Sequence, residues 1–259
     1  MLIGIDVSGN QGNIQWEEVK QSDVEFAILK LGNIYDDEPN YVDSKFSRNY
    51  KECTKQNMNI GIYVYNYCNN IDSIIEGAKW VVNKMKNKKI QLPVYIDMED
   101  ETLLKEGKEK LTNLCIEFLK IIKENGYKVG VYANLNWFKN YLDDSKFSGF
   151  SIWVAQTEVN KCDYNGKYDI WQFTHEGQIN GIKGYVDIDY LINEKLLNDS
   201  IENVIVYIVQ PGDNLTYIAQ KYNTTWQEIY KTNKDVIGNN PDLIQIGTKL
   251  IIKGGTKDE

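Results

Sequence analysis

The chain has 259 residues, of which 42% are hydrophobic and 25% charged, so it has a globular composition and can bury a sizeable core. Its length accommodates one large domain and one small one. The formal net charge of -8 argues against nucleic acid as a partner, because proteins bind that polyanion mainly through lysine and arginine.

Cysteine and histidine content restricts the chemistry further. The four cysteines lack the paired spacing of a metal site, and a chain of this length needs no disulfide, so we expect reduced thiols and no metal or cofactor. His175 is the only histidine, which disfavours zinc sites and histidine-based triads. We predict that it forms hydrogen bonds beside a loop.

The first residues enter an apolar run directly. The segment Met1–Asp6 has neither a basic leader nor a small-residue cleavage site, so we expect synthesis without a secretory signal. The longest apolar stretches have the length of strands, far short of the ~20 residues that span a bilayer, so no membrane association is expected.

Short β-branched or aromatic runs alternate with longer segments of helical periodicity through the first three quarters of the chain. This order is typical of α/β proteins with a mostly parallel sheet or barrel. The predicted strands are Leu2–Val7, Glu25–Leu31, Ile60–Tyr67, Pro93–Glu99, Val129–Asn134, Ser151–Ala155, Asp169–Phe173 and Tyr185–Tyr190. Little helix separates the last three, so the sequence predicts five βα units and three closing strands.

Two of the intervening segments have clear helical patterns. Within Asp72–Lys88, Ser73 and Glu76 have the spacing of a capping box. Glu109–Asn125 carries an apolar stripe, and Gly126 follows it where a left-handed residue commonly ends a helix.

The pattern changes near residues 194–203, where polar residues precede a new apolar run. We therefore predict a domain of residues 1–197, a linker of residues 198–203 and a second domain of residues 204–253. The second domain is predicted as a βααβ unit, with elements at Val204–Val209, Leu215–Tyr222, Trp226–Asn233 and Lys249–Lys253. A unit this small rarely holds an active site as well as a core.

Two carboxylates at the end of the fourth predicted strand are the strongest local signal for chemistry. Asp97 and Glu99 are two residues apart, so on a strand they share a face with Cα atoms ~6.6 Å apart. Neighbouring negative charges raise one pKa and so prepare one acid and one base, which is what glycoside hydrolysis requires. Two solvated acids at a strand end are the alternative.

Further acids and aromatic residues are expected beside this pair. Asp6 ends the first strand, and Asp187 and Asp189 come at the end of the last one; in a parallel barrel all carboxyl ends share one rim, where active sites lie. We expect Asp6 and either Asp187 or Asp189 to converge on Asp97 and Glu99. Aromatic residues of the same rim are candidates for contact with a ligand: Tyr63, Tyr65, Tyr132 and Trp153.

Seven short segments together resemble the glycoside hydrolase family 25 lysozymes, over Met1 to about Leu191. They are Gly4–Ser8, Gly61–Tyr65, Tyr95–Glu99, Val131–Asn134, Trp153–Gln156, Trp171–Phe173 and Val186–Asp187. The resemblance implies an irregular TIM-like (β/α)5(β)3 barrel and cleavage of the β-1,4 bond between N-acetylmuramic acid and N-acetylglucosamine. It implies that Glu99 is the general acid/base, that Asp97 and Asp187 assist at the anomeric carbon, and that Asp6 helps to fix the site. Gln172 and Asp189 are added as substrate-binding candidates.

The tail resembles a LysM module, a binder of N-acetylglucosamine-containing glycans. The resemblance rests on Tyr207–Ala219, Asn233 and Asn240–Leu250, although Asn214 stands where the family usually has Ser or Thr, and Ile246 where it has Pro. It implies a glycan groove between two loops, formed by Gly212, Asp213, Leu215 and Thr216 on one side and by Pro241 and Ile244 on the other. Leu215 and Ile244 could equally belong to the core.

The sequence therefore predicts a two-module enzyme that cuts bacterial peptidoglycan, acts on the cell wall after release, and needs no cofactor. A chitinase-like glycosidase and a catalytically idle glycan-binding protein are the alternatives. The stereochemistry stays open: the substrate's 2-acetamido group can attack the anomeric carbon with help from Asp97, or Asp187 can attack directly or activate water. We favour the acetamido route.

Overall fold

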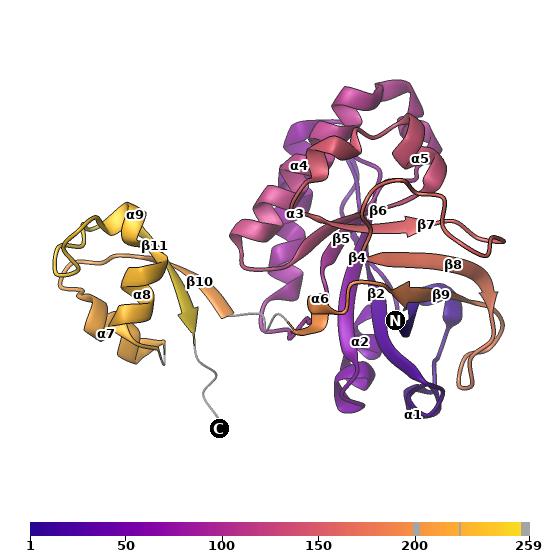
Figure 1. Ribbon diagram of the computed structural model, residues 1–259, viewed down its shortest axis with the longest axis horizontal. Coiled ribbons are helices and arrows are strands. Elements are labelled where there is room, and N and C mark those ends of the chain that lie inside the picture. The colour runs from indigo at the N-terminus through magenta and orange to yellow at the C-terminus, as the bar shows by residue number, and fades with distance from the viewer. Residues whose placement is uncertain (199–202, 223, 255–259) are drawn as a thin grey trace. The chain divides into compact units, whose positions relative to one another are not determined.

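The computed structural model describes residues 1–198, 203–222 and 224–254, which form two compact units (Figure 1). In the larger unit, eight strands close into a barrel because β1 pairs with both β2 and β9. The barrel strands, in chain order, are β1 (Leu2–Val7), β2 (Val24–Ile34), β4 (Asn59–Asn66), β5 (Val94–Asp97), β6 (Val129–Asn134), β7 (Ser151–Ala155), β8 (Ile170–Gly177) and β9 (Val186–Leu191). A short strand that was not predicted, β3 (Tyr41–Val42), pairs with the end of β2.

The order of the barrel strands confirms the prediction, but the direction of the last strand does not. Strand β9 runs antiparallel to both of its neighbours, β8 and β1, whereas the other barrel pairs are parallel. The expectation that Asp187 and Asp189 lie at the carboxyl end of a parallel strand was therefore wrong. Because β9 is reversed, its amino end lies at the rim where β1 ends, and this brings Asp187 there.

Helices connect the parallel strands. They are α1 (Trp16–Lys20), α2 (Phe46–Lys55), α3 (Ile71–Met85), α4 (Lys108–Glu124) and α5 (Leu135–Asn140), followed after the barrel by α6 (Lys195–Asn198). Helix α3 is capped by Asn70, whose side chain accepts a hydrogen bond from the backbone amide of Ser73, so the predicted capping box was wrong. Helix α4 ends as predicted, with Gly126 at a φ of 87°.

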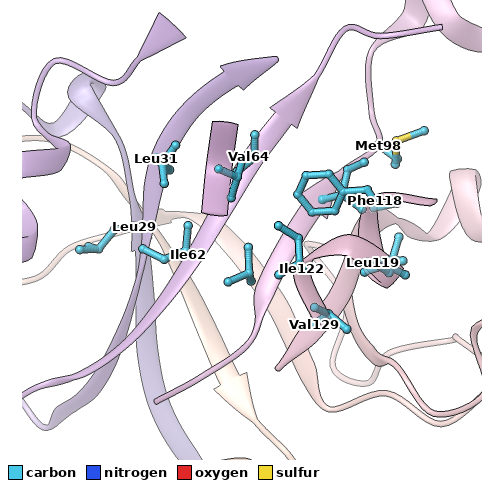
Figure 2. Close-up of a cluster of buried hydrophobic side chains, with 14 of the residues drawn as sticks. Leu29, Leu31, Ile62, Val64, Met98, Phe118, Leu119, Ile122 and Val129 are labelled. Carbon is cyan, nitrogen blue, oxygen red and sulfur yellow. The ribbon is translucent and has the colours of Figure 1, made fainter. Parts of the chain in front are cut away.

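Apolar side chains fill the layer between the barrel and its helices. Figure 2 shows part of this layer, in which Leu29 and Leu31 of β2 and Ile62 and Val64 of β4 belong to the same buried cluster as Phe118, Leu119 and Ile122 of α4. These strand residues are two apart and so share the outer face of the barrel. The four cysteines are buried and free, as predicted.

A second buried cluster fills the lower interior of the barrel. It contains Phe26, Ile28, Leu92, Tyr95, Tyr132, Trp153, Ala155, Ile170 and Leu191. Gly4 belongs to this interior, and a methyl group there would overlap the ring of Phe26, so the ring fills the space that a larger residue would need. Strand residues two apart share a face, so the next inward-facing residue toward the mouth is polar on three of these strands. Asp97 follows Tyr95 in this way, Gln172 follows Ile170, and Asp189 precedes Leu191. The apolar floor thus supports a polar layer at the mouth of the barrel.

The smaller unit confirms the predicted βααβ order. Strands β10 (Asn203–Ile208) and β11 (Lys249–Gly254) pair antiparallel, with α7 (Leu215–Lys221), α8 (Trp226–Thr232) and the short, unpredicted α9 (Lys234–Ile237) between them. The buried Asn233 side chain bonds to the backbone of both Ile229 and Ile251, which joins α8 to β11. Most of the predicted linker, residues 198–203, lies outside the described residues. Across the described ranges, the helices are too short or too polar to cross a bilayer.

Candidate active site

The mouth of the barrel brings together the acids that the sequence singled out. Asp6 and Asp187 are directly opposite each other on β1 and β9, and Asp189 is opposite Gly4, one step deeper. Asp97 is the last residue of β5, and Glu99 follows two residues beyond the strand. The predicted strand, which extended to Glu99, was therefore too long. The charges of Asp189, Asp187 and Asp97 all act on Asp6, so the acids form one electrostatic group.

Glu99 is partly exposed and anchored from the next strand. The backbone amide of Asn134, at the end of β6, donates a hydrogen bond to Glu99 Oε1. Burial raises the pKa of the Glu99 carboxyl, and hydrogen bonding from Asn134 opposes that rise only in part. A carboxyl that keeps its proton to a higher pH than usual and still reaches solvent is suited to donate a proton.

Asp97 occupies a more enclosed position than Glu99. Only 5% of its surface is exposed, and its Oδ1 atom is buried without a hydrogen-bond partner among the described residues. Burial, followed by the negative charge of Glu99, raises the pKa of Asp97 well above its usual range. The two carboxyls therefore compete for protons, which is the arrangement expected from their spacing in the sequence.

Asp6 is held by a chain of two hydrogen bonds. Gln172 Nε2 donates to Asp6 Oδ2 over 2.6 Å, and Gln172 Oε1 accepts from the Tyr132 hydroxyl over 2.9 Å. Both ends of the Gln172 amide are thus occupied, and the residue is buried. The structure therefore gives Gln172 the task of orienting Asp6, in place of the predicted direct contact with substrate.

Trp153 and Asp189 form the floor beneath the mouth. Trp153 Nε1 donates to Asp189 Oδ1 over 2.7 Å, and the two residues are 1% and 0% exposed. Asp189 Oδ2 has no hydrogen-bond partner within the described part of the chain, and burial raises the pKa of this carboxyl well above its usual range. Because Trp153 and Asp189 have almost no accessible surface, they lie beneath the residues that a substrate entering the mouth would meet first.

Tyrosines of β4 remain available at the mouth. Tyr63 and Tyr65 are partly exposed, whereas Tyr132 is largely buried by its ring contact with Trp153, at 4.3 Å between ring centroids. The Tyr65 hydroxyl donates to Asp100 Oδ2 over 3.3 Å, which fixes the ring beside Asp97. Tyr63 and Tyr65 therefore keep their predicted place as surfaces for a sugar ring.

The structure also places Lys30 near the acids, a residue that sequence reasoning missed, and brings His175 to the same region. Lys30 Nζ lies 5.1 Å from the ring centroid of Tyr65, and its charge acts on Asp97. Burial lowers the pKa of Lys30. The signal in the sequence was a charged residue inside an otherwise apolar strand. His175 lies two residues before the end of β8, next to the segment that leads to β9, and its charge acts on Asp187.

In the smaller unit, the first predicted glycan loop is built by local hydrogen bonds. Asp213 Oδ2 accepts from the Tyr207 hydroxyl over 2.6 Å and from the amide of Gln210 over 2.7 Å. Gly212 makes the turn at a φ of 87°. Asn214 caps α7 by accepting from the amide of Tyr217, so Asn performs the capping that Ser or Thr provides elsewhere.

The predicted glycan-binding residues of the tail divide by exposure. Leu215 is buried in the core of the smaller unit, and Ile244 packs against that core, so Leu215 is corrected to a core residue. Gly212 and Thr216 are exposed, and Pro241 is partly exposed. These three and the outer part of Ile244 remain the predicted contact surface.

Acids can also bind metals, but the geometry here gives no sign of it. In the parts of the chain that the structure describes, no three His, Cys, Asp or Glu side chains are arranged to hold a metal ion.

The model of the glycosyl hydrolases family 25 matches residues 5–182, which include most of the barrel. The chain belongs to this family. Strand β9 with Asp187 lies beyond the matched range, and its place in the site comes from the strand pairing alone. In the tail, residues 207–253 match the LysM domain.

Individual relatives of this family 25 chain agree with the match. The autolytic lysozyme of Clostridium acetobutylicum is 25% identical over 224 residues, which are 85% of this chain and 64% of that protein. The chain thus spans somewhat less than two thirds of the length of that relative. The crystal structure of the CTP1L endolysin has a TM-score of 0.67 at 26% identity, over 78% of this chain and 69% of that one. A family 25 glycosyl hydrolase from Bacillus anthracis has a TM-score of 0.63 at 26% identity, over 75% and 91% of the two chains.

Proposed function

We propose that this chain is a muramidase, which hydrolyses the β-1,4 bond between N-acetylmuramic acid and N-acetylglucosamine in bacterial peptidoglycan. The observation that carries the proposal is the pair of carboxyls at the mouth of the barrel. Glu99 is partly exposed with a raised pKa, and the enclosed Asp97 acts on the same group of acids. Membership of family 25 and similarity to an autolytic lysozyme and an endolysin support this choice of substrate.

In the proposed reaction, Glu99 donates its proton to the leaving glycosidic oxygen and later takes a proton from the attacking water. The hydrogen bond from the Asn134 amide fixes the position of the carboxyl relative to the sugar. Because the residue is partly exposed, it can reach a substrate that enters the mouth and can regain a proton from solvent. Proton donation by a positioned carboxyl contributes ~10²–10⁴ to the rate.

The remaining acids act on the other side of the scissile bond. Asp97 accepts a hydrogen bond from the acetamido N–H and stabilises positive charge as the bond breaks. Asp187 adds negative charge near the anomeric carbon, and Asp6, which Gln172 orients, helps to fix the site. Tyr63 and Tyr65 provide ring faces for the sugars.

The tail is proposed to bind N-acetylglucosamine-containing strands of the wall through Gly212, Thr216, Pro241 and Ile244. A weak anchor of this kind raises the local concentration of the hydrolase on an insoluble polymer, without any new contact at the active site. In this proposal residues 1–197 form the catalytic domain, residues 198–203 the linker, and residues 204–253 the anchor, and the protein works at the bacterial cell wall.

Digestion of purified peptidoglycan and of chitin, side by side, tests the proposal. A muramidase produces new reducing ends on muramic acid, which reduction and mass spectrometry identify, and it leaves chitin largely intact. Release of soluble fragments from chitin at a comparable rate would favour the chitinase-like alternative. Binding to both polymers without any new reducing end would favour the idle glycan-binding protein.

A further inference from the structure

Strand β8 is irregular at the point where it faces Asp187. In the pairing with β9, Thr174 is opposite Ile188 and Gly177 is opposite Val186. His175 and Glu176 together therefore stand opposite the single residue Asp187. Two residues facing one is the arrangement of a β-bulge, a feature that redirects side chains and is frequent beside active sites.

Local contacts fix this bulge. The Thr174 hydroxyl accepts a hydrogen bond from the backbone amide of Glu176 over 3.1 Å, which satisfies a donor that the strand pairing leaves free. A side chain at Gly177 would overlap Ile188, so the absence of a side chain lets the strands approach directly after the bulge. The irregularity is thus a fixed part of the fold, and it places the exposed His175 opposite Asp187.

The environment of Asp187 disfavours its ionised form, because the side chain is partly buried and several of its neighbours are acids. Burial raises the pKa of Asp187 to about 6, and the charge of His175 is the largest influence that lowers it. Six titratable groups interact electrostatically with Asp187. Asp189 belongs to the same strand, and the others come from elsewhere in the barrel: Asp6, Tyr63, Glu99, Tyr132 and His175. Of these, only a histidine side chain can carry a positive charge.

We infer that His175 is a positioning residue that favours the ionised form of Asp187 at the mouth of the barrel. The inference rests on the proposed function, because Asp187 is useful in glycoside hydrolysis only as a carboxylate. A positively charged imidazole attracts the Asp187 carboxylate, whereas the neighbouring acids repel its charge. Because a histidine side chain attracts a carboxylate only when it is positively charged, the effect of His175 is expected on the acidic side of the pH profile.

The test is an NMR titration of Asp187 in the full chain labelled with ¹³C at the aspartate carboxyls. The Asp187 signal is identified by its loss in Asp187→Asn. In His175→Gln the titration midpoint of Asp187 should rise by about 0.3–0.7 pH unit, the size expected for a partly exposed charge pair. His175→Lys keeps a cation and should return the midpoint most of the way. Lys183→Gln, which removes an exposed cation from the segment that joins β8 to β9, should leave it unchanged.

The same variants are then assayed on peptidoglycan at pH 5 and pH 7.5. His175→Gln should lose about threefold more kcat/KM at pH 5 than at pH 7.5, and His175→Lys should not. A midpoint and a pH profile that stay unchanged in His175→Gln would overturn the inference. If the unmodified protein cleaves no peptidoglycan, the proposed function fails, and the titration still decides whether His175 acts on Asp187.

Discussion

Asp6 and Asp187 face each other directly across the antiparallel pair of β1 and β9, with both side chains on the inner face of the barrel. Two carboxylates this close cannot both ionise freely. Burial and mutual repulsion raise the pKa of Asp6 well above its usual range, and burial raises that of Asp187 to about 6. The mouth of the barrel therefore holds protons to a higher pH than ordinary aspartic acids do, and both the activity and the stability of the protein should depend on pH accordingly.

The first prediction concerns Glu99. Glu99→Gln keeps the shape of the side chain but removes the acidic proton, so turnover on peptidoglycan should fall by ~10²–10⁴. Because burial raises the pKa of Glu99, activity of the unmodified protein should persist to a higher pH than an ordinary glutamic acid allows, and then decline as Glu99 loses its proton. Initial rates between pH 4 and pH 9 measure both effects.

The exposed Glu101, two residues farther along, provides the matched control. Glu101→Gln should retain nearly full activity, and both variants should show the thermal unfolding temperature of the unmodified protein to within a few degrees. If Glu99→Gln kept more than a tenth of the activity, Glu99 would not be the proton donor.

The second prediction concerns the stability of the barrel. A buried acid with a raised pKa retains its proton in the folded state at a pH where the unfolded chain has lost it. The free energy of unfolding therefore falls as pH rises from about 4, the usual pKa of Asp, through the raised folded pKa. For Asp187 this loss lies between about pH 4 and pH 6, and for the fully buried Asp189 it continues up to the raised pKa of that carboxyl.

Asp189→Asn removes the carboxylate and keeps an oxygen that can accept from Trp153 Nε1. The variant should therefore unfold at a higher temperature than the unmodified protein at pH 8, by about 2–4 °C for each kcal/mol recovered, with a smaller gain at pH 4. Calorimetry at the two pH values measures the difference. The exposed Asp37→Asn should show no such dependence on pH, and an equal gain at both pH values would refute the electrostatic explanation.

The sequence predicted the order of the barrel strands but not the direction of β9. A strand pattern identifies which residues alternate between two faces, and it is the same for parallel and antiparallel neighbours. The length of the connection held the missing information: residues 178–185 between β8 and β9 are too few for the crossover of a dozen or more residues that parallel strands require. The sequence thus predicted correctly that Asp6 and Asp187 converge, but it assumed a parallel β9. In the structure the two residues meet because β9 runs antiparallel to β1.

Depth within the barrel was the second property that the sequence could not give. Alternation places Trp153, Gln172 and Asp189 on the inner face with Tyr63, but it does not distinguish the floor from the mouth. That distinction depends on the stagger of neighbouring strands, which pairing across the barrel determines. The outcome is that Tyr63 remains accessible, whereas Trp153 and Asp189 support the acids from below.

The third prediction concerns the independence of the two units. A chain that ends at Asn198 should fold and cleave soluble wall fragments, whereas residues 204–253 alone should bind insoluble peptidoglycan and cleave nothing. The separate hydrophobic cores of the barrel and the tail are the physical reason. Binding should change little between low and high salt, because contacts with neutral sugars are not screened. Pull-down with peptidoglycan, with cellulose as the control polymer, measures it, and a molten or aggregated shorter chain would contradict the predicted boundary.

The fourth prediction concerns the stereochemistry of cleavage. Asp97 and Glu99 lie at the end of one strand, whereas Asp187 lies on β9, four places away from β5 around the closed ring of strands. An Asp and a Glu side by side can serve a substrate whose own 2-acetamido group attacks the anomeric carbon: Asp97 orients the group and Glu99 protonates the leaving oxygen. Water then enters from the original face, and the configuration is retained.

In the competing routes Asp187 acts across the mouth, either as a direct nucleophile, which also retains the configuration, or as a base that activates water, which inverts it. NMR of the anomer that forms first during cleavage of a defined oligosaccharide separates these outcomes. The acetamido route requires the β-anomer first, and the α-anomer first would contradict it.

Because direct attack by Asp187 also gives the β-anomer, the second measurement is a search for a covalent adduct by mass spectrometry with a fluorinated substrate analogue. An adduct on Asp187 would replace the acetamido route. Its absence, together with strong inhibition by a thiazoline that mimics the cyclised acetamido group, is the result expected if Asp97 holds that group in place.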